Sequence, residues 1–197
     1  METGLIILAA GASTRLGRAK QQLVYKGQNL LQRAVQEGYA SACTPVVVVL
    51  GARAAQLELD LPAAPVLHTT ENPDWQQGMA SSVKAGLQKM LAVAPAVGGI
   101  ILMVCDQPFA DRHILNNLIN TLQSSEKKIA ACAYSETLGT PVMFSKPLFQ
   151  ELLQLQGQEG AKKLLFKYAH DVAAVPFAKG SIDIDTAADY AALRLSE

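Results

Sequence analysis

Three cationic side chains follow the first apolar run of the sequence. Arg15, Arg18 and Lys20 fall within six residues, in the segment LAAGASTRLGRAK at positions 8–20. The small residues at its start let a backbone approach a ligand closely, and the free N–H groups of such a turn can hold anionic oxygens. A guanidinium can grip two phosphate oxygens at once, whereas an ammonium acts as a compact point charge. These residue types and spacings predict a phosphate-binding loop; a strand–helix turn with solvated cations is the simpler alternative.

The segment matches neither of the two common phosphate-binding motifs. A P-loop needs the spacing GxxxxGK[ST], but five residues separate Gly11 from Gly17. The dinucleotide fingerprint needs GxGxxG, and Ser13 stands where its second glycine would be. Any phosphate bound here is therefore held by a different kind of loop.

An acidic side chain, Asp106, comes just after the apolar run at positions 100–104. If that run is a central strand of an open α/β sheet, the carboxylate points into the crevice where ligands bind. Carboxylate oxygens suit Mg²⁺, which proteins usually hold through one or two carboxylates plus substrate phosphates. The sequence therefore predicts a magnesium site at Asp106. The structural alternative is that Asp106 starts the turn before Pro108 or caps the next helix.

Short apolar runs rich in β-branched residues predict the strands that would position these side chains. The clearest are residues 5–9, 46–50 and 100–104, which lack the alternation of half-exposed strands; weaker candidates are residues 129–133, 141–144 and 172–177. Helical periodicity occupies residues 30–38, 82–91, 112–122, 147–155 and 186–195. The last of these opens with Thr186 and Asp189 at capping-box spacing. The alternation predicts an α/β fold: a doubly wound, mostly parallel sheet with helices on both faces and a site at the carboxyl ends of the strands.

The composition limits the classes of function that remain. The chain has 197 residues, of which 50% are apolar, and 17 basic against 17 acidic side chains. Length and apolar content predict one domain over residues 1–197, and the balanced charge offers no basic surface for nucleic acid or an anionic membrane. The most apolar stretch, residues 91–105, is too short and too broken to span a bilayer, and no signal peptide is evident. Cys43, Cys105 and Cys132 lack CxxC spacing, which favours buried reduced thiols in a cytoplasmic protein.

The loop at positions 8–20 resembles the LAAGxSxRxGxxK signature of the MobA-like nucleotidyltransferases, which include molybdenum cofactor cytidylyl- and guanylyltransferases. The resemblance implies a Rossmann-like nucleotidyltransferase fold in which this loop wraps a nucleoside triphosphate. It assigns Arg15 and Lys20 to triphosphate binding and charge neutralisation. Backbone contacts to the nucleotide are assigned to Ala9, Ala10, Gly11 and Ala12.

Two further stretches resemble the family's metal-binding motifs. Residues 105–108, CDQP, resemble its aspartate-containing strand end, which supports Asp106 as a ligand of Mg²⁺. Residues 183–189 resemble its D-[IV]-D-T-P-x-D segment, in which the aspartate before threonine supports the metal; that residue is Asp185. Alanines stand here where proline and glutamate are common. An acid beside a helix N-terminus is also favourable in itself, so a purely structural role for Asp185 is the alternative.

Residues 72–82 resemble the NPxWxxGMxSS stretch of the cytidylyltransferase-like branch. We expect one of Ser81 and Ser82 to cap the helix that follows and the other to contact the nucleotide, and we assign the nucleotide contact to Ser82. Together with Ala12 and Ser13 in place of the paired glycines typical of guanylyltransferases, this stretch favours CTP as the nucleotide.

The second half of the chain carries two segments that could meet a second substrate. Residues 139–144 resemble the family's GHPxxF segment, with Thr140 in place of the histidine. Residues 157–165 resemble its GDxGAxxLL loop, with Gln158 in place of the aspartate. Lys162 and Lys163 of that loop could meet an anionic substrate or lie on a solvated helix face.

The predicted reaction is the Mg²⁺-dependent transfer of a nucleoside monophosphate onto a phosphate, with release of pyrophosphate. Such a nucleophile is already ionised at neutral pH, so it needs positioning and charge neutralisation rather than a catalytic triad. The resemblance implies CTP as the donor, molybdopterin carrying molybdenum as the acceptor, and a molybdoenzyme or its chaperone as a protein partner. A guanylyltransferase of the same family and a non-catalytic nucleotide-binding accessory protein are the alternatives.

Overall fold

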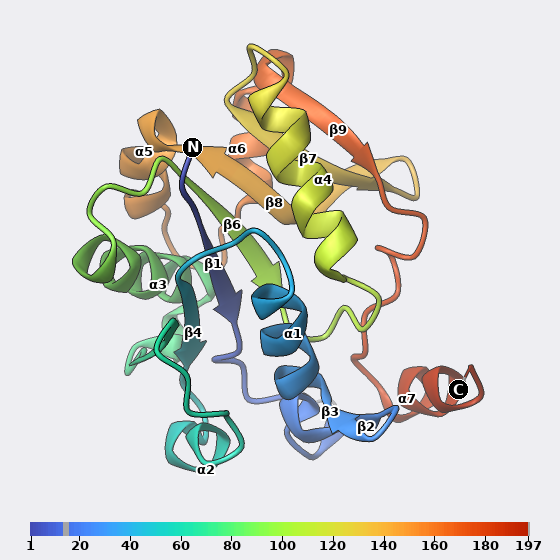
Figure 1. Cartoon of the computed structure of the whole chain (residues 1–197). Helices are drawn as coiled ribbons and strands as arrows, with labels where there is room; N and C mark the ends of the chain where they lie inside the picture. The colour runs from blue at the N-terminus through green and yellow to red at the C-terminus, as the bar shows by residue number, and fades with distance from the viewer. Residues whose placement is uncertain (14–15, 197) are drawn as a thin grey trace.

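A seven-stranded sheet forms the centre of the computed structural model, which describes residues 1–13 and 16–196 (Figure 1). The order across the sheet is β5 (Leu67–Glu71), β4 (Val46–Leu50), β1 (Thr3–Leu8), β6 (Gly99–Val104), β8 (Thr137–Ser145), β7 (Ile129–Tyr134) and β9 (Val172–Pro176). Among these strands, β8 alone runs antiparallel to its neighbours. The predicted α/β class with a mostly parallel sheet is confirmed.

The central strands lie where the sequence is continuously apolar. Every residue of β4 is buried, and in β1 Leu5 is in register with Val46 of β4 and Ile101 of β6. A strand covered on both faces has no solvent-facing positions, which is why these runs show no polar alternation. Because β4, β1 and β6 are parallel, their carboxyl ends meet at one edge of the sheet.

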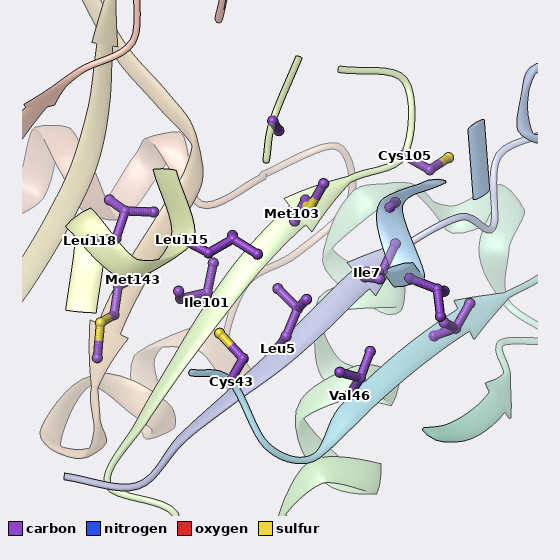
Figure 2. Packing of buried hydrophobic residues seen from close by; sticks show 14 of the residues in the cluster. Leu5, Ile7, Cys43, Val46, Ile101, Met103, Cys105, Leu115, Leu118 and Met143 are labelled. Carbon is purple, nitrogen blue, oxygen red and sulfur yellow. The ribbon is translucent and has the colours of Figure 1, made fainter. Parts of the chain in front are cut away.

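Helices cover both faces of this sheet (Figure 1). One face is covered by α1 (Leu30–Tyr39), α2 (Ala54–Glu58) and α4 (Arg112–Gln123), and the other by α3 (Met79–Val93), α5 (Phe149–Leu153) and α6 (Lys162–Lys167). Figure 2 shows the first face, where Leu5 and Ile101 pack against Leu115 and Leu118 of α4. No described helix is long and apolar enough to cross a membrane.

Several short elements carry no periodic pattern and are not predicted. They are β5, α2, α6, the two-stranded β2 (Val24–Tyr25) and β3 (Gln28–Asn29), and the 3₁₀ turns η2 (Lys20–Gln22), η3 (Trp75–Gln77) and η5 (Ala169–Asp171). The helix predicted at residues 147–155 consists of the 3₁₀ turn η4 (Lys146–Leu148) followed by α5. Strand β5 is an edge strand with the sequence LHTTE, and its polar side chains hide it from a search for apolar runs.

The C-terminal helix α7 (Ala187–Arg194) packs away from the sheet, beside β2 (Figure 1). Its predicted capping box is confirmed: the Thr186 side chain accepts from the Asp189 N–H, and the Asp189 carboxylate accepts from the Thr186 N–H. Leu193 of this helix joins a separate apolar cluster with Tyr25 and the fully buried Ile184. The helix thereby anchors the segment that precedes it.

The three cysteines are free and buried, as predicted. Burial raises the pKa of Cys43 to about 11 and that of Cys132 to about 12. Burial and the neighbouring charge of Asp106 raise the pKa of Cys105 to about 12. Since the thiolate is the reactive form of cysteine, these side chains are protected both by packing and by protonation.

We therefore expect the folded protein to resist a thiol-specific disulfide reagent at mildly alkaline pH. Denaturation in guanidinium chloride should expose all three thiols of the chain to rapid reaction. The measurement is the absorbance released on thiol exchange, with and without denaturant. Rapid labelling of any cysteine in the folded protein, at the rate of a free thiol, would contradict the burial described above.

Candidate active site

A cleft of about 500 Å³ opens at the carboxyl ends of β1 and β6. It is hereafter the first cleft, and it lies at the strand edge where the sequence predicted a site. Its walls are residues 8–13, 20–21 and 104–106, together with Trp75, Gln76, Gly78, Met79, Ser82 and Gln158.

The loop after β1 is held in shape by a buried glutamine. Gln21 is only 1% exposed, and its Nε2 donates to the carbonyls of Ala9 at 2.8 Å and Gly11 at 2.9 Å. Ser13 adopts a positive φ of 56°, and its hydroxyl accepts from the Lys20 N–H at 3.1 Å. These bonds fold the loop back on η2. Sequence reasoning misses Gln21, because a glutamine beside a lysine is normally solvated and only its burial reveals the role.

The residues assigned to backbone contacts, Ala9 to Ala12, all line the first cleft. The N–H of Ala9 donates to the Val49 carbonyl at 2.9 Å, so this group is engaged by the sheet. Arg15, assigned to triphosphate binding, lies outside the described residues. Arg18 places its guanidinium 5.0 Å from the centre of the Tyr190 ring on α7 and does not line the cleft. Of the predicted cations, Lys20 is the one that the structure places in the cleft wall.

Lys20 lies between two carboxylates from distant parts of the chain. Its Nζ forms a close ion pair with Asp106 Oδ2 and lies 3.2 Å from Asp185 Oδ1. Burial alone would lower the pKa of Lys20, but the charge and hydrogen bond of Asp106, with the charge of Asp185, outweigh it and raise the pKa. The lysine is therefore a permanent cation that compensates two acids.

Backbone hydrogen bonds bring the two carboxylates together. The N–H of Ile184 donates to the carbonyl of Asp106 at 3.0 Å, which ties the C-terminal segment to the end of β6. The Asp189 carboxylate accepts from the N–H of Asp185 at 3.1 Å, so the capping box of α7 also fixes the backbone of that aspartate. Asp106 does not cap the following helix, since Asp111 accepts from the first N–H groups of α4.

The arrangement fits a divalent cation. Asp106 Oδ1 is buried and has no hydrogen-bond partner among residues 1–13 and 16–196, while Asp106 Oδ2 and Asp185 Oδ1 converge on one positive charge. In the described part of the chain, no three or more acidic, cysteine or histidine side chains form a metal-binding group. Two carboxylates with room for substrate oxygens is the donor set typical of Mg²⁺ sites that also bind phosphates.

A third acid, Asp183, lies close by and was not assigned a role from the sequence. Burial, followed by the charges of Asp106 and Asp185, raises its pKa to about 6. Its side chain lines a neighbouring cleft rather than the first one. Its position in the segment before Asp185 was visible in the sequence, but its place in the wall of a cleft was not.

The prediction that Ser81 or Ser82 caps a helix is wrong. Helix α3 begins at Met79, with Gly78 before it, so both serines lie inside its first turn. They are held instead by the buried Asn72, whose Nδ2 donates to Ser81 Oγ at 2.8 Å and to Ser82 Oγ at 3.0 Å. Ser82 lines the first cleft, and the Asn72 bonds account for the spacing of asparagine and serines in this stretch.

Gly78 joins this stretch to the loop that follows α5. Its φ is +113°, and a Cβ at this position would lie 2.3 Å from the carbonyl oxygen of Gly157. The N–H of Ala80 donates to the same oxygen at 3.1 Å. A side chain at position 78 would therefore push apart two segments that both contribute to the cleft walls.

A second cleft of about 420 Å³ adjoins the first and shares Met79, Val104 and Gln158 with it. It lies between β8, the 157–165 segment and Asp183. Thr140 and Gln158, two of the departures from the family's motifs, both line it. Lys162 lines it as well, whereas Lys163 pairs with Glu159 and lines neither cleft.

Comparison with known proteins agrees with this geometry. Residues 5–172 match the family described as the MobA-like NTP transferase domain. The purine catabolism protein PucB of Bacillus subtilis (strain 168) is 32% identical over 96% of this chain and 94% of its own length. The molybdenum cofactor cytidylyltransferase of Escherichia coli (strain K12) is 25% identical over 94% of this chain and 92% of its own.

A solved structure extends the likeness to three dimensions. Rv0371c of Mycobacterium tuberculosis H37Rv, in a complex with manganese, superposes with a TM-score of 0.78 at 27% identity and covers 100% of both chains. The match to the family over most of the sequence, and the placement of its signature loop beside paired carboxylates, lead to one conclusion. This chain belongs to the MobA-like NTP transferase family and is a nucleotidyltransferase.

Proposed function

We propose that the protein transfers a nucleoside monophosphate from CTP to the phosphate of a molybdopterin-type acceptor carrying molybdenum, with Mg²⁺ as the cofactor and pyrophosphate as the second product. The observation that carries this proposal is the ion pair of Lys20 with Asp106 in the wall of the first cleft, with Asp185 Oδ1 at 3.2 Å from the same ammonium. A cation shared by two acids, next to a loop with small residues, is a site built for phosphates and a divalent metal.

Each group has a defined task in this reaction. The triphosphate lies along the loop of residues 9–13, whose backbone fits close to it because the side chains are small. Asp106 and Asp185 would hold Mg²⁺, which would supply a Lewis-acid charge at the phosphate oxygens when bound. Lys20, with Arg15 by resemblance, neutralises negative charge that builds on the leaving pyrophosphate.

The bond changes need no protein nucleophile. An oxygen of the acceptor phosphate attacks the α-phosphorus and forms a new P–O bond. The bond from the α-phosphorus to the bridging oxygen breaks, and its electron pair leaves with pyrophosphate. Because the attacking phosphate is already anionic, the protein has to align two substrates and offset their charges, and no side chain has to remove a proton.

The choice of CTP rests on the residue types at Ala12 and Ser13, on the 72–82 stretch, and on similarity to a cytidylyltransferase. A GTP-using relative is the alternative within the family. The proposal includes a cytoplasmic location, which rests on the three buried thiols, and delivery of the product to a molybdoenzyme or its chaperone, which rests on the family resemblance.

The direct test measures pyrophosphate release from each of the four common nucleoside triphosphates with Mg²⁺ and molybdopterin carrying molybdenum. Thermal shifts with the same nucleotides report binding independently, since a ligand at one hundred times its Kd adds about 2.7 kcal/mol to the free energy of unfolding. We expect the largest shift and the fastest release with CTP. A shift without release, in the presence of the acceptor, would favour the non-catalytic accessory role instead.

Asp106→Asn should reduce pyrophosphate release by about a thousandfold, because it removes a metal-binding charge at the transition state. The variant keeps the shape of the side chain, so its circular dichroism should match that of the parent. Asp171→Asn, which alters an exposed ion pair with Lys128, is the matched control and should retain full turnover. Near-normal turnover in Asp106→Asn would remove this residue from the mechanism.

Lys20→Met should weaken nucleoside triphosphate binding by about tenfold to a hundredfold, the worth of hydrogen bonds to charged groups. It should also lower the melting temperature, because two partly buried carboxylates lose their shared cation. Calorimetric titration and thermal melts measure the two effects. Lys163→Met serves as the control, since that lysine lines neither cleft; equal nucleotide affinity in both variants would argue against a role for Lys20.

A further inference from the structure

The second cleft offers a place for the acceptor and carries charge at two separate points. It adjoins the first cleft through Met79, Val104 and Gln158, so a molecule lying in it can present a phosphate to the first cleft. The charged side chains in its walls are Asp183 and Lys162. Their positions decide which end of an acceptor each would meet.

The two charges have different surroundings in the wall of the second cleft. Asp183 stands two residues before Asp185, which pairs with Lys20 beside Asp106. Lys162 is the first residue of α6, lines the second cleft, and also lines an outer hollow of about 630 Å³ beyond it. Lys162 does not line the first cleft, whereas Gln158 lines both.

Lys162 differs from the other lysines of its helix. Lys163 pairs with Glu159 and Lys167 with Glu151, both at the protein surface. Within residues 1–13 and 16–196, no hydrogen bond or ion pair engages the ammonium of Lys162. The exposed Lys162 ammonium in the wall of a cleft is therefore available for an anion brought by a ligand.

The remaining walls favour a partly apolar ligand with hydrogen-bonding groups. Leu138, Val142 and Leu165 contribute apolar surface, and the Thr140 hydroxyl and the Gln158 amide contribute neutral hydrogen-bonding groups. In the family's motifs, a histidine stands at the position of Thr140 and an aspartate at the position of Gln158. Both side chains are neutral here, and Lys162 is the cationic side chain among the described residues that line this cleft.

We propose that Lys162 binds a second anionic centre of the acceptor, at the end remote from the phosphate that is attacked. The acceptor class is then a phosphate monoester with a partly apolar body and a further negative charge. This inference rests on the proposed function, because it takes the attacking phosphate to lie at the border of the two clefts. Under this inference, Lys162 contributes to the choice of acceptor and does not contact the nucleotide.

The test is direct binding of molybdopterin, a phosphate monoester that also carries an anionic dithiolene, followed by its fluorescence under anaerobic conditions without nucleotide. Lys162→Met should raise the Kd for molybdopterin by about tenfold to a hundredfold, and Lys162→Arg should restore most of the affinity. Lys163→Met, one residue away, should change it by less than about twofold. The Kd for CTP with Mg²⁺ should stay the same in all three variants.

Equal acceptor affinity in Lys162→Met and the parent would overturn the inference, as would equal losses in Lys162→Met and Lys163→Met. A parent protein that does not bind molybdopterin at all would overturn it too. The proposed function fails in a different way. If Lys162-dependent acceptor binding is found but no nucleoside triphosphate yields pyrophosphate, the role of Lys162 stands and the transfer reaction does not.

Discussion

The neutralisation of Asp106 and Asp185 by Lys20 is the interaction on which the site depends. Two carboxylates sheltered from water repel each other and resist folding unless a cation lies between them. A hydrogen bond fixes the backbone of each of the three residues. The Lys20 N–H donates to the Ser13 hydroxyl, the Asp106 carbonyl accepts from the Ile184 N–H, and the Asp185 N–H donates to the capping box of α7. The zero net charge of the chain therefore conceals a concentrated arrangement of opposite charges at one edge of the sheet.

The single antiparallel strand explains how two clefts come to share that edge. Strand β7 is parallel to β9 and ends at the same edge as β6, so the turn into β8 returns the chain beside the site. The first residues of β8, including Thr140, then form a wall of the second cleft. A wholly parallel sheet would need a long crossover at this point and would place that wall elsewhere.

The sequence predicts the parts of the fold whose burial leaves a pattern. Continuous apolar runs mark β1, β4 and β6 because both of their faces are covered, and Asp111 marks the start of α4 because it caps it. Edge strand β5 is missed because half-exposed positions tolerate threonine and histidine. In the site, the resemblance to the family's motifs implies the pairing of distant carboxylates, whereas Gln21 and Asn72 are missed. Their roles come from burial among backbone groups, which no local pattern encodes.

The division of the walls between the two clefts has a consequence for how such a protein can diverge. The described residues of the first cleft come mainly from positions 8–106, and those of the second mainly from positions 134–183. Met79, Val104 and Gln158 are the described residues common to both. Substitutions in one stretch can thus reshape the walls of one cleft while most of the other cleft's walls stay unchanged. The two clefts of this fold are therefore open to change one at a time.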